Sequence, residues 1–135
     1  MSAEGPVFFY DGVCALCNGG VKFVLKRDER GTVRFAPLQG ETARTFLATH
    51  PALDAIDSMI WVAADGTISI RSDAVIAIGK HIGGVWGALA GLARVVPRPV
   101  RDAIYDFTAR IRYRTFGKYD ACPIPPQEQR GRFLA

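Results

Sequence analysis

Three features are scarce in this chain, and each scarcity excludes a class of protein. The 135 residues include only three cysteines, a small and odd number that does not suit a domain held together by several disulfides. No apolar run reaches the about 20 residues of a membrane-spanning helix. The apolar run Val7–Tyr10 is shorter than the roughly 7–15 residues of a secretory signal. The sequence therefore predicts a cytoplasmic protein with no membrane span, whose cysteines stay reduced.

The chain does contain enough apolar material for one core. Apolar residues make up 49% of the sequence and charged residues 22%, which excludes general disorder. The length fits one domain. We predict a single domain over residues 1–122 and a proline-rich tail over residues 123–135, where Pro123, Pro125 and Pro126 prevent regular strand pairing.

The net charge of +4 is unevenly distributed. Residues 1–93 carry eight basic and nine acidic side chains, whereas residues 94–135 carry nine basic and four acidic ones. Such a basic segment can contact nucleic acid, anionic lipid or an acidic partner, or it can be a solvated helix face followed by a tail. Because its arginines are spread along a helix without an aromatic stacking platform, we predict no nucleic-acid binding. The oligomeric state is left open.

Hydrophobic periodicity predicts an α/β fold with the order β-α-β-α-β-β-α, followed by two more helices. We expect strands at residues 7–10, 33–36, 58–63 and 67–71, and helices at 14–28, 41–49, 72–81, around 86–92 and from 99 onward. A helix between the first two strands makes them parallel, with a right-handed crossover. Asp65-Gly66 predicts a tight hairpin between the last two strands.

Three details of side-chain placement are also predicted. Ser72 or Asp73 can cap the helix after the fourth strand, because their side-chain oxygens accept hydrogen bonds from free N–H groups. Trp61 and Trp86 fall on apolar stripes and are expected in the core. The last helix carries an apolar stripe that we expect to face the core. This stripe consists of Val100, Ile104, Phe107 and Ile111.

The most informative segment joins the first strand to the first helix and contains Cys14 and Cys17. A CxxC pair at such a junction is typical of thiol–disulfide exchange. Near a helix N-terminus, unpaired N–H groups and the macrodipole favour the thiolate, which is the form that attacks disulfides. Cys17 lies one turn further on, on the stripe of Val21 and Val24. We therefore expect Cys14 to be the exposed, attacking thiol and Cys17 to be the shielded, resolving thiol.

Three other residues are candidates for supporting roles. Asp11 can accept a proton from Cys17 during exchange, or it can form the turn with Gly12 and satisfy N–H groups at the helix start. Asn18 can form a hydrogen bond near the site, or it can be an ordinary early helix residue. Cys122 is either an accessory third thiol or a lone thiol without a redox role.

Two other interpretations of the cysteine pair stay open. The pair can be half of a zinc site, but structural zinc takes four ligands and the further candidates, Cys122, His50 and His81, are scattered along the chain. Both cysteines can instead be small core residues of a redox-idle interaction module with the same fold. We expect no metal and no organic cofactor.

Four sequence blocks carry a resemblance that extends over nearly the whole chain. They are FYDGVCALCNGGVKFVLKRD (9–28), RFAPLQ (34–39), RSDA (71–74) and RYRTFGKYDACP (112–123). In these blocks the chain resembles the DCC family of thiol–disulfide oxidoreductases, whose name stands for Asp-Cys-Cys; Asp11, Cys14 and Cys17 match these letters. The resemblance implies a thioredoxin-like fold and a redox role, with a protein or small-molecule disulfide or thiol as substrate.

One feature departs from better-studied thioredoxin-like enzymes. Those enzymes place a cis-proline just before the third strand, where it helps to hold an extended substrate chain. Residues 56–60 of this chain, IDSMI, contain no proline. The missing proline argues against a general protein-disulfide reductase and leaves two alternatives open, a narrower substrate or the loss of reductase activity.

Overall fold

The computed structural model describes residues 6–12, 14–28, 32–38, 40–54, 59–117 and 133 of the chain. In these residues it has a four-stranded sheet of order β2-β1-β3-β4. The strands are β1 (Val7–Tyr10), β2 (Arg34–Pro37), β3 (Ile60–Val62) and β4 (Ile68–Ile70). β1 pairs with β2 in parallel, while the β1–β3 and β3–β4 pairs are antiparallel. The parallel first pair and the final hairpin are thus confirmed.

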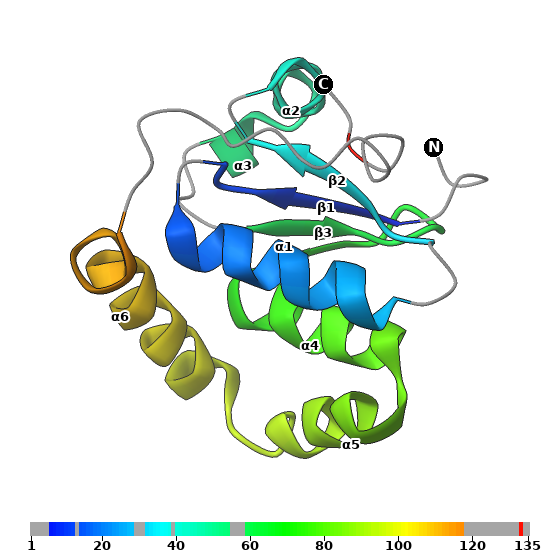
Figure 1. Cartoon of the computed structure of the whole chain (residues 1–135), viewed down its shortest axis with the longest axis vertical. Helices are drawn as coiled ribbons and strands as arrows, with labels where there is room; N and C mark the ends of the chain where they lie inside the picture. Colours follow the sequence, from blue (N-terminus) through cyan, green and yellow to red (C-terminus); the bar gives the residue numbers. More distant parts are fainter. Residues whose placement is uncertain are drawn as a thin grey trace.

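Helices cover both faces of the sheet (Figure 1). α1 (Ala15–Arg27) and α4 (Arg71–Ile82) lie on one face, and α2 (Glu41–Ala48) and α3 (Pro51–Asp54) lie on the other. α5 (Gly84–Ala93) and α6 (Arg98–Phe116) lie outside α1 and α4, away from the sheet. The single turn α3 is the one helix in the described residues that the sequence did not predict, because four residues are too few to show a helical period.

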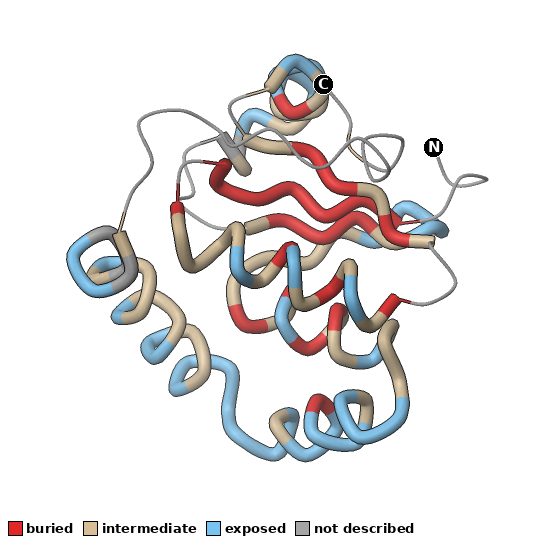
Figure 2. Tube along the Cα trace, in the orientation of Figure 1, coloured by how far each residue is buried: buried red, intermediate tan, exposed pale blue. Residues whose placement is uncertain are grey.

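β1 contributes to two cores, one on each face of the sheet. Phe8 and Tyr10 pack in the core under α1 and α4, whereas Val7 and Phe9 pack in the core under α2. All four residues are buried (Figure 2). Successive side chains of a strand point to opposite faces, so the unbroken apolar run of β1 is what a sheet covered on both sides requires.

The segment predicted to be a tail contributes one residue to the described structure. Phe133 stacks on Phe35 of β2, with ring centroids 5.2 Å apart, and thereby joins the core under α1 and α4. The rest of residues 123–135 lies outside the described part of the chain. The boundary between domain and tail at residue 122 stays a prediction.

The β3–β4 turn forms through the Asp65-Gly66 pair, as predicted. Gly66 has φ 93°, a left-handed conformation that glycine adopts without strain. The Asp65 carboxylate accepts a hydrogen bond from the Thr67 N–H at 2.9 Å. This bond stabilises the ionised form and therefore lowers the pKa of Asp65 below its usual value of 3.8.

The start of α4 differs from the prediction. Its N-cap residue is Ile70, which has no capping side chain, and β4 passes directly into the helix through Arg71 at φ 53°. Ser72 and Asp73 therefore lie inside the first turn. The Ser72 N–H instead donates to the carboxylate of Asp102 on α6, at 3.4 Å. A residue from another helix thus takes the capping role, since α4 begins one residue earlier than the sequence suggested.

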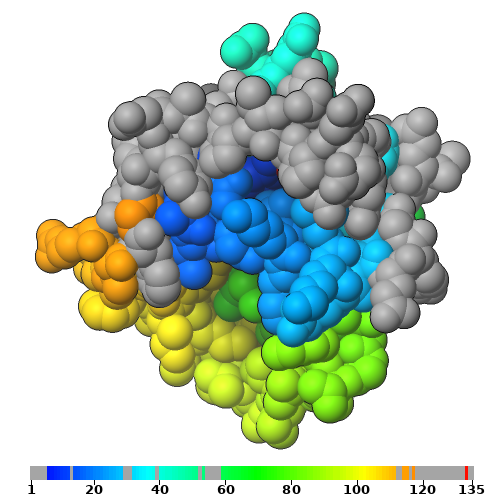
Figure 3. Space-filling model, in the orientation of Figure 1, coloured from blue at the N-terminus to red at the C-terminus, as the bar shows by residue number. Residues whose placement is uncertain are grey.

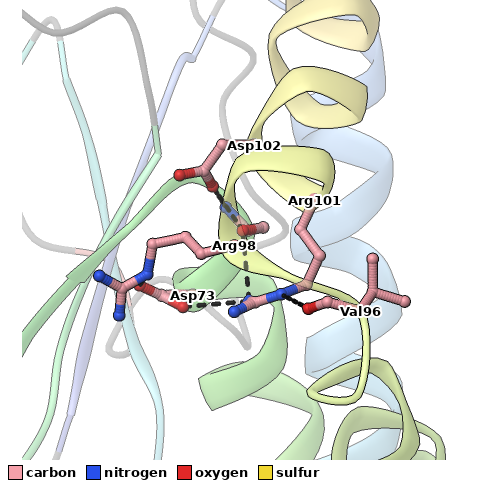
Figure 4. Close-up of polar contacts among 6 residues, drawn as sticks. Asp73, Val96, Arg98, Arg101 and Asp102 are labelled. Atoms are coloured by element: carbon pink, nitrogen blue, oxygen red, sulfur yellow. Dashed lines mark hydrogen bonds and ion pairs between the residues drawn. The ribbon is translucent and has the colours of Figure 1, made fainter.

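α6 is held against α4 by polar side chains (Figure 4). The Ser72 hydroxyl donates to Asp102, and the guanidinium of Arg101 lies 3.1 Å from the Asp73 carboxylate. Arg98 pairs with the other oxygen of Asp73 at 3.2 Å. The inward side of α6 is therefore a hydrogen-bonded and charged surface.

The apolar stripe of α6 faces outward, so its predicted place in the core is wrong. Val100, Ile104 and Phe107 are 49%, 61% and 59% exposed. Polar pairs with α4, whose partners lie about thirty residues away in sequence, decide which side of α6 turns inward. Trp61 is a core residue as predicted, but Trp86 is 37% exposed and packs edge-to-face on Phe23.

Candidate active site around Cys14 and Cys17

The cysteine pair lies at the end of the sheet where β1 stops. The chain turns after Tyr10, and the Cys14 N–H donates to the Asp11 carbonyl at 3.2 Å, which closes the turn. α1 begins immediately afterwards at Ala15. Because Phe9 pairs with Ile60 in the antiparallel register, Met59 lies opposite Tyr10 at this same end of the sheet. The turn, the first turn of α1 and the start of β3 therefore meet here.

Cys14 is the N-cap residue of α1. Its backbone is extended, and its sulfur accepts the N–H of Cys17 at 3.3 Å. A serine or aspartate oxygen commonly takes this position at an N-cap and satisfies an N–H that has no partner inside the helix. The contact therefore makes the Cys14 sulfur the acceptor that caps the first turn of α1.

The burial of the two cysteines is the reverse of the prediction. Cys14 is 0% exposed, whereas Cys17 is of intermediate exposure and packs at the border of the core under α1 and α4. The sequence placed Cys14 at an exposed helix tip. However, a side chain that caps the helix folds back over the first turn, and this geometry turns the sulfur inward.

Asn18 is brought into the site by its amide group. Its Nδ2 donates to the Gly12 carbonyl at 2.7 Å and to the Cys14 carbonyl at 2.9 Å. These two bonds join the turn before Cys14 to the first turn of α1. Asn18 is thus an early residue of α1 that also forms hydrogen bonds near the cysteine pair, and its supporting role in exchange stays a prediction.

α6 contacts this site at two points that the sequence did not reveal. The Gly117 carbonyl, just after α6, accepts the Ala15 N–H at 3.2 Å. The Tyr105 hydroxyl accepts the Met59 N–H at 3.0 Å. Gly117 has φ 99°, and a glycine after a long helical pattern predicts the end of the helix. It does not predict which residue its carbonyl will contact. Tyr105 has no local sequence signal at all.

The family of this chain follows from its match to a family model. The model of DCC1-like thiol-disulfide oxidoreductases matches residues 8–118. The chain belongs to this DCC1-like family. The four-stranded sheet covered by helices is consistent with the thioredoxin-like α/β fold that the resemblance implies. Membership assigns the chain thiol–disulfide oxidoreductase activity, so the protein is an enzyme.

Two curated relatives are similar to the chain over most of its length, and one of them is named as a DCC family protein. The chain is 41% identical over 129 residues to the protein YuxK of Bacillus subtilis, covering 95% of this chain and 93% of YuxK. It is 40% identical over 120 residues to a DCC family protein of Arabidopsis thaliana, described as chloroplastic, covering 88% of this chain and 69% of that protein. No solved structure shows a significant match to the chain.

The remaining candidates of this DCC1-like chain have different outcomes. Asp11 is buried beside the cysteine turn, at 8% exposure, and its role as a proton acceptor stays a prediction. Cys122 lies outside the described residues.

Within the described part of the chain, no three His, Cys, Asp or Glu side chains gather where a metal ion could bind. His50 stacks on Phe46, and His81 contacts Thr32.

No helix in the described ranges combines the length and the apolar character needed to cross a bilayer.

Proposed function

We propose that Cys14 and Cys17 carry the thiol–disulfide exchange, with Cys14 attacking and Cys17 resolving. The observation that supports this division is the hydrogen bond from the Cys17 N–H to the Cys14 sulfur, at 3.3 Å. The bond places the Cys14 sulfur at the N-terminus of α1, where backbone N–H groups face it, and this is the placement typical of an attacking thiol in thiol–disulfide exchange. The intermediate exposure of Cys17 gives the second thiol room to approach.

The reaction proceeds by two exchanges. The Cys14 thiolate attacks one sulfur of a substrate disulfide, forms a mixed disulfide and releases the other substrate sulfur as a thiolate, which takes up a proton. The Cys17 thiol loses its proton and attacks the Cys14 sulfur, which forms the Cys14–Cys17 disulfide and releases the second substrate thiol. The substrate gains two electrons. Two donor thiols, or one dithiol, then return the cysteine pair to its reduced form and leave as a disulfide.

The burial of Cys14 supports a narrow substrate. Because Cys14 is 0% exposed, neighbouring groups must move before any disulfide reaches its sulfur, and a small opening suffices for the disulfide of a small molecule or an unfolded peptide. We propose such a substrate rather than the disulfides of folded proteins. We also propose the cytoplasm as the compartment, because it keeps thiols reduced and could resupply electrons. Asp11, close to the pair, is proposed as the acceptor of the Cys17 proton.

Trapping the mixed disulfide tests the division of roles. The Cys17→Ser variant, incubated with oxidised glutathione or a disulfide-bonded peptide, should accumulate an adduct on Cys14 that mass spectrometry can assign. The Cys14→Ser variant should lose exchange activity. A Cys122→Ser variant is the matched control and should behave as the unmodified protein. If the adduct forms on Cys17 in the Cys14→Ser variant and turnover persists, the assignment is wrong.

A further inference from the structure

The exposed large apolar side chains of the described residues are concentrated in one stretch of chain. All but Val75 lie between residues 85 and 107, on α5, α6 and the turn between them. We call this set the α5–α6 apolar surface. Its members are Val85, Trp86, Leu89, Leu92, Val95, Val96, Val100, Ile104 and Phe107. Contiguous exposed apolar surface of this kind is uncommon on a monomer and marks a contact with another molecule or a membrane.

α5 and α6 form one continuous edge of the molecule in the space-filling view (Figure 3). The outer side of α6 is hollowed by a shallow groove of about 470 Å³, lined by Pro99, Val100, Ala103, Ile104 and Phe107. The inner side is held by the pairs of Asp102 with Ser72 and of Arg101 with Asp73. Turning the apolar stripe inward would break these pairs, so the fold keeps it outside.

In the described residues, the exposed charges that border this surface and have no acidic partner are basic. Lys80 and Arg94 are exposed, and so is Arg110, which lies one turn beyond Phe107 on α6. Arg98 and Arg101 are instead paired with Asp73. The acidic residues of α6 are engaged with α4, because Asp102 accepts from Ser72 and Asp106 pairs with Arg71 at 3.6 Å. The α5–α6 apolar surface is therefore bordered by basic side chains.

The basic border indicates which kind of molecule contacts the α5–α6 apolar surface. A second copy of the chain, packed about a two-fold axis, would bring the same basic border against itself. A bilayer with anionic lipids has the complementary chemistry. Apolar side chains enter the boundary between headgroups and acyl chains, while lysine and arginine contact the headgroup charges.

We propose that the α5–α6 apolar surface docks this protein on an anionic lipid bilayer, lying at the interface without crossing it. The proposal is independent of the roles of the two cysteines. The groove of α6 accommodates part of an acyl chain, and the basic border neutralises lipid charge.

Vesicle co-sedimentation of the full chain tests the proposal. The protein should bind vesicles of phosphatidylglycerol mixed with phosphatidylcholine, and bind pure phosphatidylcholine vesicles much more weakly. Val95→Asp should weaken binding about ten-fold, since it removes one apolar side chain from the bilayer. Arg94→Gln should weaken it about five-fold through the lost charge. Val75→Asp is the matched control, because it makes the same change at an exposed site outside the surface and should leave binding nearly unchanged.

Each variant should retain the thermal unfolding midpoint and the thiol exchange rate of the parent chain. The proposal is overturned if mixed vesicles do not sediment the protein, or if Val95→Asp and Val75→Asp weaken binding equally. It is also overturned if the protein forms a dimer without lipid that Val95→Asp disperses, since the surface would then belong to a second copy.

Discussion

The reactivity of Cys14 is decided by two opposing properties of one residue. The hydrogen bond from the Cys17 N–H holds the sulfur at the N-terminus of α1, as an attacking thiol requires, whereas complete burial restricts the approach of a reagent. Cys17 has intermediate exposure, so a reagent reaches its sulfur more easily than that of Cys14. The size of the attacking reagent should therefore decide which thiol reacts first.

Modification of the thiols with reagents of two sizes measures how reactivity and access differ between Cys14 and Cys17. A small reagent such as methyl methanethiosulfonate should modify Cys14 several-fold faster than Cys17 at neutral pH, because the thiolate is the reactive form. With the bulky Ellman reagent this preference should shrink or invert, because Cys14 is buried. Peptide mapping by mass spectrometry gives both rates. Faster modification of Cys17 by the small reagent would assign the attacking role to Cys17.

The reduction potential of the pair should be low. The Cys17 N–H donates to the Cys14 sulfur. However, Ala15 and Leu16 add no charge that would stabilise the reduced form, and the Ala15 N–H is bonded to the Gly117 carbonyl at 3.2 Å. A strongly oxidising pair depends on a stabilised thiolate. We therefore expect a potential nearer to about −270 mV than to about −120 mV. Equilibration with glutathione buffers measures this potential, and a value near about −120 mV would contradict the expectation.

At the scale of elements, α4 depends on α6 for the cap of its first turn. Asp102→Ala removes the acceptor for both the N–H and the hydroxyl of Ser72. Leaving partly buried donors without an acceptor should cost about 1–3 kcal/mol of unfolding free energy in urea titrations. Asp106→Ala is the matched control on the same helix. Its pair with Arg71 is well exposed, so its loss should cost less than about 1 kcal/mol.

If Asp102→Ala and Asp106→Ala lowered the free energy of unfolding equally, the hydrogen bonds from Ser72 to Asp102 would not be important for stability. In that case the position of α6 would be held by its other contacts.

The β3–β4 hairpin should respond to pH through Asp65. Its pKa is lowered from 3.8 by the Thr67 N–H, so the folded state holds this proton more weakly than the unfolded state does. The stabilisation is therefore present above 3.8 and is lost as the pH falls through the lowered folded pKa. An NMR titration of the Asp65 carboxyl should give a midpoint below 3.8. Asp65→Asn keeps an acceptor without a titrating group and should remove this part of the pH dependence.

At the scale of the whole molecule, the basic C-terminal part should not bind nucleic acid specifically. Its exposed arginines include Arg94, Arg110 and Arg114, and a positive surface alone supports only weak, salt-sensitive binding. Fluorescence anisotropy with DNA and RNA oligonucleotides should show binding that disappears near physiological salt. Tight binding that is lost when Arg110, Arg112 and Arg114 are changed to alanine would contradict this prediction.

Much of the fold could be predicted because its signals are local. The apolar run of β1, the Asp65-Gly66 turn and the helix break at Gly83 and Gly84 are properties of a few adjacent residues, and each is found where it was expected. The position of Cys14 at the start of α1 follows from the same kind of signal. The contacts of Tyr105 and Gly117 with the site could not be predicted, since their partners are distant in sequence.

The sequence by itself determined the order of the strands and of the longer helices, the pairing of β1 with β2 and of β3 with β4, and the placement of a CxxC pair at a helix N-terminus. The antiparallel pairing of β1 with β3 was not among its predictions. The tertiary structure alone decided that the Cys14 sulfur is buried and that the apolar stripe with Ile104 points away from the core. Periodicity shows that a helix has two different sides, but it does not show which side a neighbour will contact. For α6 that choice depended on Asp102 and Arg101 meeting the first turn of α4, a contact that exists only once the chain has folded.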